Sequence, residues 1–219
     1  MTNKGRLRRF GQKWTVSVKF FAENGKKGCS VQGFFDIMKE ANSLRKWGNV
    51  MSRVMAIANQ KGGVAKTTTA VNLAACLAHY KKKVLLIDLD PQGNATSGLG
   101  IDKQKLHRSV YDVLVNNVPA AKVLVETARA GLTLLPARVE LAGAELELVS
   151  AISREMRLKN ALEDIREQYQ YVLIDCPPSL GLLTLNALTA ADTYLVPIQC
   201  EYYALEGLSQ LLNTIRLVQ

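Results

Sequence analysis

The sequence has few of the residues that build metal centres and disulfide frameworks. Its 219 residues include four cysteines and two histidines. The cysteines form no Cys-x-x-Cys pair, and the histidines complete no zinc-ligand spacing. No apolar run approaches the roughly 18 residues of a membrane-spanning helix, and no signal-peptide apolar core is present. These absences exclude a zinc or disulfide scaffold and predict a soluble protein of a reducing, cytosolic compartment.

Excess positive charge is confined to one end of the chain. Residues 1–50 hold 11 Lys and Arg against 3 Asp and Glu, a net charge of +8. Residues 51–219 hold 17 against 16, a net charge of +1. The composition of this longer part therefore indicates no basic face, and any DNA binding by it must rest on local geometry.

Residues 1–50 show no sustained hydrophobic period. Thr15–Phe21 alternates like a strand, and Phe34–Leu44 is compatible with a short helix. We expect a basic extension that is poorly ordered, or a start codon assigned too far upstream, since Met51 and Met55 precede the first core strand. Two alternatives are a DNA-contacting arm and a mitochondrial-type transit peptide, the latter suggested by three early arginines, Arg6, Arg8 and Arg9.

Residues 51–219 alternate between apolar strands and amphipathic helices. This order predicts an α/β fold with a mostly parallel sheet and helices on both faces. The expected strands are Val54–Asn59, Val84–Asp88, Leu132–Pro136, Tyr171–Asp175 and Thr193–Pro197. The expected helices are Lys66–Tyr80, Val110–Val115, Leu141–Val149, Ser153–Tyr169, Leu182–Ala191 and Ala204–Val218.

A glycine-containing loop joins the first expected strand to the first helix. Glycines let backbone N–H groups approach anionic oxygens, and the new helix offers its own unpaired N–H groups to the same anion. In such a loop Lys66 reaches the β/γ-phosphates and the Thr67 hydroxyl ligates Mg²⁺. The common P-loop spacing places glycine where this sequence has Gln60 and Ala65. A glycine loop with solvated lysines is the alternative interpretation.

The pattern Lys-Gly-Gly-x-x-Lys-Thr, which adds Lys61 before Lys66, resembles the deviant Walker A motif of the ParA/MinD family of ATPases. This resemblance implies a P-loop NTPase-like fold, ATP as the ligand, and a Lys61 that crosses a dimer interface to the partner's nucleotide. The implied nucleotide-binding residues are consecutive: Lys61, Gly62, Gly63, Val64, Ala65, Lys66, Thr67 and Thr68.

Two further polar loops follow apolar strands. Asp175 ends its strand at the Walker B position, where a carboxylate holds Mg²⁺, although Asp at a strand end also caps helices. The resemblance implies that Asp90 positions the attacking water and contacts the metal shell, whereas Asp88 is interpreted as structural, under the P-loop. Catalytic roles are thus expected for Lys61, Lys66 and Asp90, and metal contacts for Thr67, Asp90 and Asp175.

Longer stretches resemble the chromosome-partitioning branch called Soj or ParA. They are Asp90-Pro-Gln-Gly-Asn-Ala-Thr-Ser-Gly-Leu-Gly100, Asp175 to Leu188 and Gln199 to Leu208. This resemblance implies a cytoplasmic, nucleoid-associated ATPase that forms a homodimer with ATP. It also implies nonspecific DNA binding, hydrolysis stimulated by a ParB/Spo0J-type partner, and no membrane association.

Two departures from the family pattern leave alternatives open. Ala65 replaces a glycine, where positive φ costs about 1 kcal/mol for alanine; we expect helical φ here, and therefore tolerance. The chain also stops in a helix at Gln219, so we expect the C-terminal part of the fold, with the main DNA-binding residues, to be missing. The alternatives are a non-hydrolysing regulatory fragment and a MinD-like membrane-associated positioning ATPase.

Overall fold

The computed structural model describes residues 8–9, 12–13, 16–21, 52–199 and 204–217. The helix expected at Phe34–Leu44 lies outside this part of the chain. Within the basic N-terminal segment the described residues form strands, one of which joins the main sheet. The strand expected at Thr15–Phe21 corresponds to one of them, β3 (Val16–Phe21).

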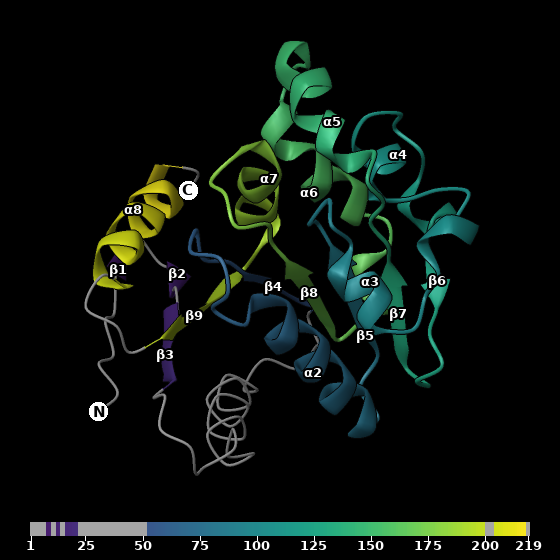
Figure 1. The fold of residues 1–219 in the computed structure, drawn as a ribbon, viewed down its shortest axis with the longest axis horizontal. Coiled ribbons are helices and arrows are strands. Elements are labelled where there is room, and N and C mark those ends of the chain that lie inside the picture. Colours follow the sequence, from purple (N-terminus) through teal and green to yellow (C-terminus); the bar gives the residue numbers. More distant parts are fainter. Residues whose placement is uncertain (1–7, 10–11, 14–15, 22–51, 200–203, 218–219) are drawn as a thin grey trace.

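A seven-stranded sheet forms the centre of the molecule (Figure 1). Its strand order is β3-β9-β4-β8-β5-β7-β6, and all neighbours are parallel except β6, which runs antiparallel to β7. The predicted α/β fold with a mostly parallel sheet is confirmed. The other strands of this sheet are β4 (Arg53–Ile57), β5 (Val84–Asp88), β6 (Val125–Glu126), β7 (Leu132–Leu135), β8 (Tyr171–Asp175) and β9 (Thr193–Gln199). A separate antiparallel pair contains β1 (Arg8–Arg9) and β2 (Gln12–Lys13).

Helices cover both faces of the sheet. One face packs against α2 (Lys66–His79) and α3 (Asn94–Gly98). The opposite face packs against α4 (Val110–Leu114), α5 (Leu141–Glu147), α6 (Arg157–Leu162), α7 (Leu182–Ala190) and α8 (Ala204–Leu217). Short 3₁₀ turns are η1 (Lys103–Lys105), η2 (Ala120–Lys122), η3 (Leu148–Ser150), η4 (Arg154–Met156) and η5 (Arg166–Gln168).

Strand β5 is buried along its whole length, on both of its faces. In β5, Leu86 packs toward α2 while Leu85 packs toward the helices of the other face, and both are fully buried. Burying one such side chain contributes about 1.5–3 kcal/mol relative to leaving it exposed. This two-sided burial fixes the strands that carry the polar loops.

The continuous helix expected over Ser153–Tyr169 is wrong, because the segment is divided into η4, α6 and η5. A buried side chain from α7 accounts for the first break. Asn186 Oδ1 accepts from the Leu158 amide at 3.0 Å, and its Nδ2 donates to the Arg154 carbonyl at 2.9 Å. In a regular helix these two backbone groups would bond to each other. Asn186 therefore replaces one helical hydrogen bond with two bonds to α7.

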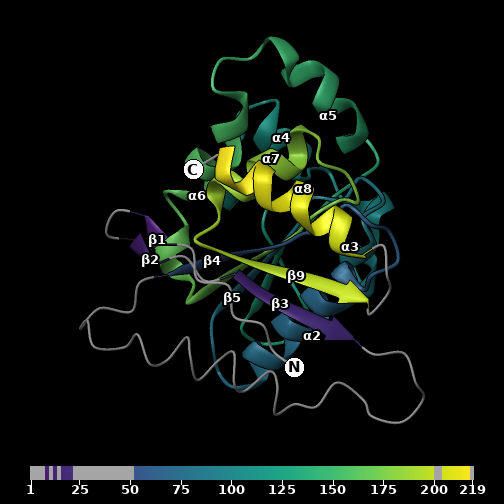
Figure 2. The ribbon, with the colours of Figure 1, turned by 90° about the vertical axis from the view of Figure 1, so that its left-hand side faces the viewer.

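Strand β3 lies at one edge of the sheet, beside β9 (Figure 2). Six consecutive residue pairs join the two strands, from Val16 with Tyr194 to Phe21 with Gln199. An uncovered edge strand presents unpaired N–H and C=O groups to other chains. The described N-terminal strand therefore covers one edge of β9.

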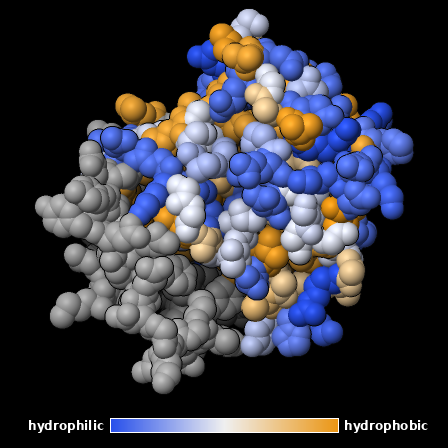
Figure 3. Space-filling view, viewed as in Figure 1, coloured by the Kyte–Doolittle hydropathy of each residue, from blue (hydrophilic) through white to orange (hydrophobic). Residues whose placement is uncertain are grey.

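Several exposed apolar side chains belong to the segment around α5. They are Val139, Leu146, Val149 and Ile152, and Figure 3 shows hydrophobic side chains gathered at the top of the molecule, where Figure 1 places α5. Among the described helices, none has the length and apolarity needed to cross a bilayer.

Candidate functional site

Three polar loops follow the neighbouring strands β4, β8 and β5, as the sequence predicts for one edge of a parallel sheet. The loops are joined through their backbones. The Cys176 amide donates to the Ile57 carbonyl at 3.2 Å, and the Leu89 amide donates to the Asp175 carbonyl at 2.9 Å. The end of β8 is thus held between the other two loops.

The loop between β4 and α2 is anchored by Asn59, a residue that the sequence analysis did not single out. Its Nδ2 donates to the Pro197 carbonyl of β9 at 2.8 Å, and its Oδ1 accepts from the Lys61 amide at 3.0 Å. Asn commonly binds the backbone two residues ahead in this way. In the sequence, the position of Asn59 as the first polar residue after an apolar strand could have indicated this role.

Lys66 is the first residue of α2 and is buried inside the loop, with 7% of its surface exposed. Its Nζ donates to the Lys61 carbonyl at 3.0 Å. Burial lowers the pKa of Lys66, and the negative charge of nearby Asp175 opposes this effect. The ammonium group is therefore held at the centre of the loop, close to an acidic neighbour.

Two residues of the loop have left-handed backbone conformations. Gly63 has φ 71°, and Ala65 has φ 63° at the N-cap of α2. The expected helical φ at Ala65 is wrong, so this alanine is in a conformation that costs about 1 kcal/mol or more for a residue with a Cβ. At Gly62 and Gly63 an added Cβ would meet no atom within 4 Å, so the loop borders open space.

The remaining predicted loop residues differ in how much they expose. Val64 is buried, and Thr67 is half-buried. The exposed residues Lys61 and Thr68 lie on either side of them. The structure thus brings the sequence-predicted loop residues together as one continuous cradle.

Asp175, at the end of β8, is fully buried. Neither of its carboxylate oxygens completes a hydrogen bond within the described part of the chain. Burial raises its pKa to about 7, with smaller increases from Asp88 and Asp90, while the adjacent Thr67 hydroxyl and Lys66 lower it. A buried carboxylate with so few hydrogen bonds is costly, and a cation would relieve that cost.

The two acids near the end of β5 have different environments. Asp88 is fully buried and accepts from the Thr96 amide at 2.8 Å, the Thr96 hydroxyl at 2.7 Å and the Asp90 amide at 3.2 Å. Burial nevertheless raises its pKa. Asp90 Oδ1 accepts from the Gln92 amide at 2.9 Å, which closes a turn. Asp88 thus holds its own loop, and Asp90 lies in that loop nearer the surface.

Lys66, Asp175 and Asp90 are close enough to influence one another electrostatically, since both acids oppose the lowering of the Lys66 pKa. The described residues contain no group of three His, Cys, Asp or Glu side chains that forms a metal cage. A buried ammonium group beside two carboxylates suits an anionic ligand that binds together with a metal ion and supplies some of the metal's ligands itself.

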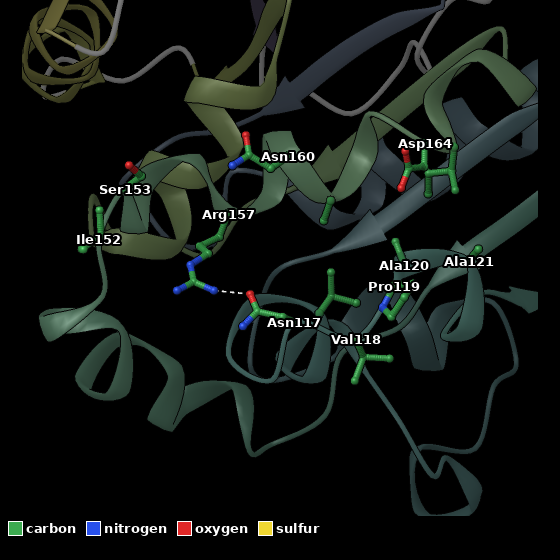
Figure 4. A pocket seen from close by; sticks show the side chains of 13 residues that line it. Asn117, Val118, Pro119, Ala120, Ala121, Ile152, Ser153, Arg157, Asn160 and Asp164 are labelled. Atoms are coloured by element: carbon green, nitrogen blue, oxygen red, sulfur yellow. Dashed lines mark hydrogen bonds between the residues drawn. The ribbon is translucent and has the colours of Figure 1, made fainter.

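A separate hollow of about 440 Å³ lies between α4 and α6 (Figure 4). Its polar side chains include Arg157, which donates a hydrogen bond to Asn117, and Asp164. None of the sequence-predicted site residues lines it.

Comparison with known proteins identifies relatives of the α/β domain. Residues 52–219 match the AAA_31 family, described as an AAA domain. The chain is 62% identical over 169 residues to the sporulation initiation inhibitor protein Soj of Bacillus subtilis (strain 168), covering 77% of this chain and 67% of Soj. It is 55% identical over 175 residues to the chromosome partitioning protein ParA of Myxococcus xanthus (strain DK1622), covering 80% and 62%. The chain therefore spans roughly two thirds of these relatives.

Solved structures share the fold. One is titled cobyrinic acid a,c-diamide synthase from Mycobacterium smegmatis with bound ADP and magnesium; it has a TM-score of 0.74 and 52% identity, covering 77% of this chain and 69% of that one. A plasmid partition protein from Borrelia burgdorferi has a TM-score of 0.69 and 30% identity, covering 77% and 74%.

Proposed function

The chain belongs to the AAA-domain family of Soj and ParA partitioning ATPases, and we propose that it binds ATP with Mg²⁺, dimerises on the nucleotide and hydrolyses it as a switch. The observation that carries this proposal is the position of Lys66. Its ammonium group lies inside a glycine-containing loop at a helix N-terminus, 3.0 Å from a carbonyl that a phosphate oxygen would replace as its partner.

The residues present fit a nucleotide phosphate group. The loop borders open space at Gly62 and Gly63, and α2 begins directly after it. The backbone N–H groups of the loop and the charge of Lys66 would hold the β/γ-phosphates. The relative from Mycobacterium smegmatis, solved with ADP and magnesium, supports this assignment.

The residues also fit a hard divalent cation. Asp175 presents two buried carboxylate oxygens beside the Thr67 hydroxyl, and neither oxygen makes a hydrogen bond of normal geometry with the described residues. Mg²⁺ usually binds through one or two carboxylates together with substrate phosphates. When bound, it would neutralise charge on the phosphates. We assign Thr67 and Asp175 to the metal, with Asp90 in its outer shell.

Hydrolysis requires a water positioned in line with the γ-phosphate and positive charge around the transferred group. We assign the water to Asp90, in the loop beside β8. Lys66 would supply charge within the subunit. Exposed Lys61 would supply charge to the partner's nucleotide, so the complete site would form only in the dimer.

As a Soj/ParA-type protein, the chain would bind DNA nonspecifically in its ATP-bound dimer and release it after hydrolysis stimulated by a ParB/Spo0J-type partner. The name of the Myxococcus relative supports a role in chromosome partitioning, and the name of the Borrelia structure supports the plasmid alternative. We place this role in the cytoplasm, at the nucleoid. We assign the cobyrinic acid chemistry named for the Mycobacterium structure a lower rank, because the Myxococcus relative, at higher identity, is named for chromosome partitioning.

A non-hydrolysing regulatory role is the second candidate. The left-handed backbone of Ala65 favours it, because strain at the residue before Lys66 would weaken nucleotide binding. Turnover measurements on the same chain separate the two candidates.

The test is equilibrium binding of a fluorescent ATP analogue, together with phosphate release measured with and without duplex DNA and a ParB-type partner. Lys66→Ala should abolish binding, whereas Lys159→Ala, which removes an exposed lysine on α6, should not. Unchanged affinity in Lys66→Ala would refute the nucleotide site. Tight binding without any phosphate release would favour the regulatory candidate.

A further inference from the structure

A basic hollow of about 380 Å³ lies near the β6 edge of the sheet, away from the P-loop. Two short segments form it, one leading into α4 and the other leading into β6 (Figure 1). Its lining consists of Lys105, Leu106, His107, Arg108, Lys122, Val123, Leu124 and Val125. We call this feature the basic hollow.

Every charged side chain that lines the basic hollow is a cation, and His107 adds an imidazole ring. The three cations are exposed. Lys105 Nζ lies 3.6 Å from the carboxylate of Asp102. Both side chains are largely exposed, so this ion pair is weak and leaves the positive charge of Lys105 able to interact with a ligand. Because residues 51–219 are nearly neutral overall, this is a local concentration of positive charge.

Nearby acids are engaged in local structure. Asp112 accepts from the Ser109 amide at 2.9 Å in the capping box of α4. Glu126 accepts from the Thr133 hydroxyl at 3.1 Å. These carboxylates serve the backbone and the adjacent strand, and neither lines the basic hollow.

The backbone beneath the cations is fixed. Val123 is buried in the core, and its amide donates to the Ala120 carbonyl at 2.9 Å. Ser109, directly after Arg108, is the N-cap of α4 and is also buried. The cations are therefore presented from ordered positions, which lowers the entropic cost of placing them on a ligand.

We propose that the basic hollow binds the phosphate backbone of duplex DNA, with Lys105, Arg108 and Lys122 each contacting phosphate oxygens. This inference rests on the proposed DNA-binding function. Arg offers a planar fork of donors and Lys a compact charge, both suited to phosphate, and such contacts carry no sequence preference. The two lining segments contain no amphipathic helix that would insert into a lipid surface.

The basic hollow is separated from the nucleotide site by position in the sheet. The P-loop follows β4, whereas β6 is at the far edge, with β8, β5 and β7 between them. Removing the cations should therefore leave ATP binding and turnover unchanged. This separation allows the DNA surface to be tested independently of the ATPase.

The experiment measures binding of the full chain, with ATP and Mg²⁺, to a labelled DNA duplex across a range of salt concentrations. The test variant combines Lys105→Gln, Arg108→Gln and Lys122→Gln. The matched control combines Lys81→Gln, Lys83→Gln and Lys159→Gln, which remove three exposed lysines outside the basic hollow. ATP turnover without DNA is measured for all three proteins.

We expect the test variant to lose at least tenfold in DNA affinity at about 0.1 M salt and to reduce the salt slope by about 2 to 3, since each phosphate contact contributes about 0.9. The control should retain affinity within about threefold. Equal loss in both variants, or wild-type affinity and slope in the test variant, would overturn the proposal.

Two further outcomes also overturn it. One is binding to vesicles of anionic phosphatidylglycerol that depends on the three cations while DNA binding does not. The other is no DNA binding by the wild-type chain; turnover of ATP in that case would leave the nucleotide-switch part of the proposed function standing. A wild-type chain that neither binds DNA nor turns over ATP would refute both.

Discussion

Lys66 Nζ donates a hydrogen bond of 3.0 Å to the backbone carbonyl of Lys61, so one lysine of the motif is held by the main chain of the other. The side chain of Lys61 has no part in this bond. Its role can therefore be separated from that of Lys66 by substitution.

Lys61→Ala should leave nucleotide affinity of the monomer nearly unchanged, because the carbonyl that holds Lys66 is retained. It should impair turnover and ATP-dependent dimerisation, because its proposed contact is with the partner's nucleotide. Nucleotide titration at low protein concentration and light scattering with ATP are the measurements. A loss of monomer affinity as large as that of Lys66→Ala would make Lys61 a ligand within its own subunit.

Asp90→Asn should retain ATP binding and slow hydrolysis by about 10²-fold or more, since a water-positioning group acts mainly in the transition state. Asparagine keeps an oxygen that can accept from the Gln92 amide, so the turn is preserved. Single-turnover phosphate release measures the chemical step, and light scattering should show an accumulated dimer. Wild-type hydrolysis in this variant would exclude the assigned role.

Ala65→Gly should increase the free energy of unfolding by up to about 1 kcal/mol, because φ at residue 65 is 63° and glycine adopts this conformation without strain. If the strain also opposes ATP binding, affinity should rise up to about fivefold. Gly63→Ala is the reciprocal variant, since its φ is 71° and an added Cβ meets no atom within 4 Å. It should lose stability by a similar amount. Urea denaturation of both variants tests the pair, and a destabilised Ala65→Gly would contradict the strain argument.

Asp175→Asn should stabilise the nucleotide-free protein, and the gain should be clearly larger at pH 8 than at pH 5.5. The folded-state pKa of Asp175 is raised to about 7 from the ordinary 3.8, so the folded protein retains a proton that the unfolded chain has lost between these values. Stability therefore falls as pH rises from about 4 to about 7. Neutral asparagine removes this dependence while removing the proposed Mg²⁺ ligand.

Thermal unfolding of Asp175→Asn and the wild type at the two pH values gives the comparison. An equal difference in unfolding temperature at pH 5.5 and pH 8 would show that Asp175 does not titrate in this range. Added Mg²⁺ and ATP should stabilise the wild type more than the variant.

A chain that begins at Met51 should be less stable and more prone to self-association than the full chain, because it lacks β3 and leaves the edge of β9 uncovered. A chain that lacks only residues 1–13 retains β3 and should behave as the full chain does. Sedimentation and thermal unfolding of the two truncations are the measurements. Equal behaviour of both truncations would show that the β3 pairing contributes nothing to stability.

The sequence predicted strand positions best where the strand is buried on both faces, because only apolar residues are tolerated there. The predicted bounds Val84–Asp88 and Tyr171–Asp175 agree with β5 and β8, because these apolar runs are covered on both faces. The convergence of their polar ends follows from parallel pairing, which the alternation of strands and helices already indicated.

Long-range side-chain contacts were not predictable. Asn186 forms hydrogen bonds with the Arg154 carbonyl and the Leu158 amide. No local sequence pattern in either segment predicts these contacts. The positive φ of Ala65 likewise depends on how the loop closes around Lys66, whereas alanine by itself prefers a negative φ. The candidate site residues were therefore proposed from their motif, whereas the backbone conformation that holds them could not be predicted.

The pairing of β3 with β9 also sets an order of events during folding. Val16 pairs with Tyr194, so nearly all of the described chain must be synthesised before this strand meets its neighbour. Contacts of such long sequence separation form slowly, because the chain loses loop-closure entropy before it gains the stabilising contacts. We therefore expect the central strands to assemble first and this edge to close last. Until β3 pairs, the backbone N–H and C=O groups along that edge of β9 would be accessible to a chaperone or to a second nascent chain.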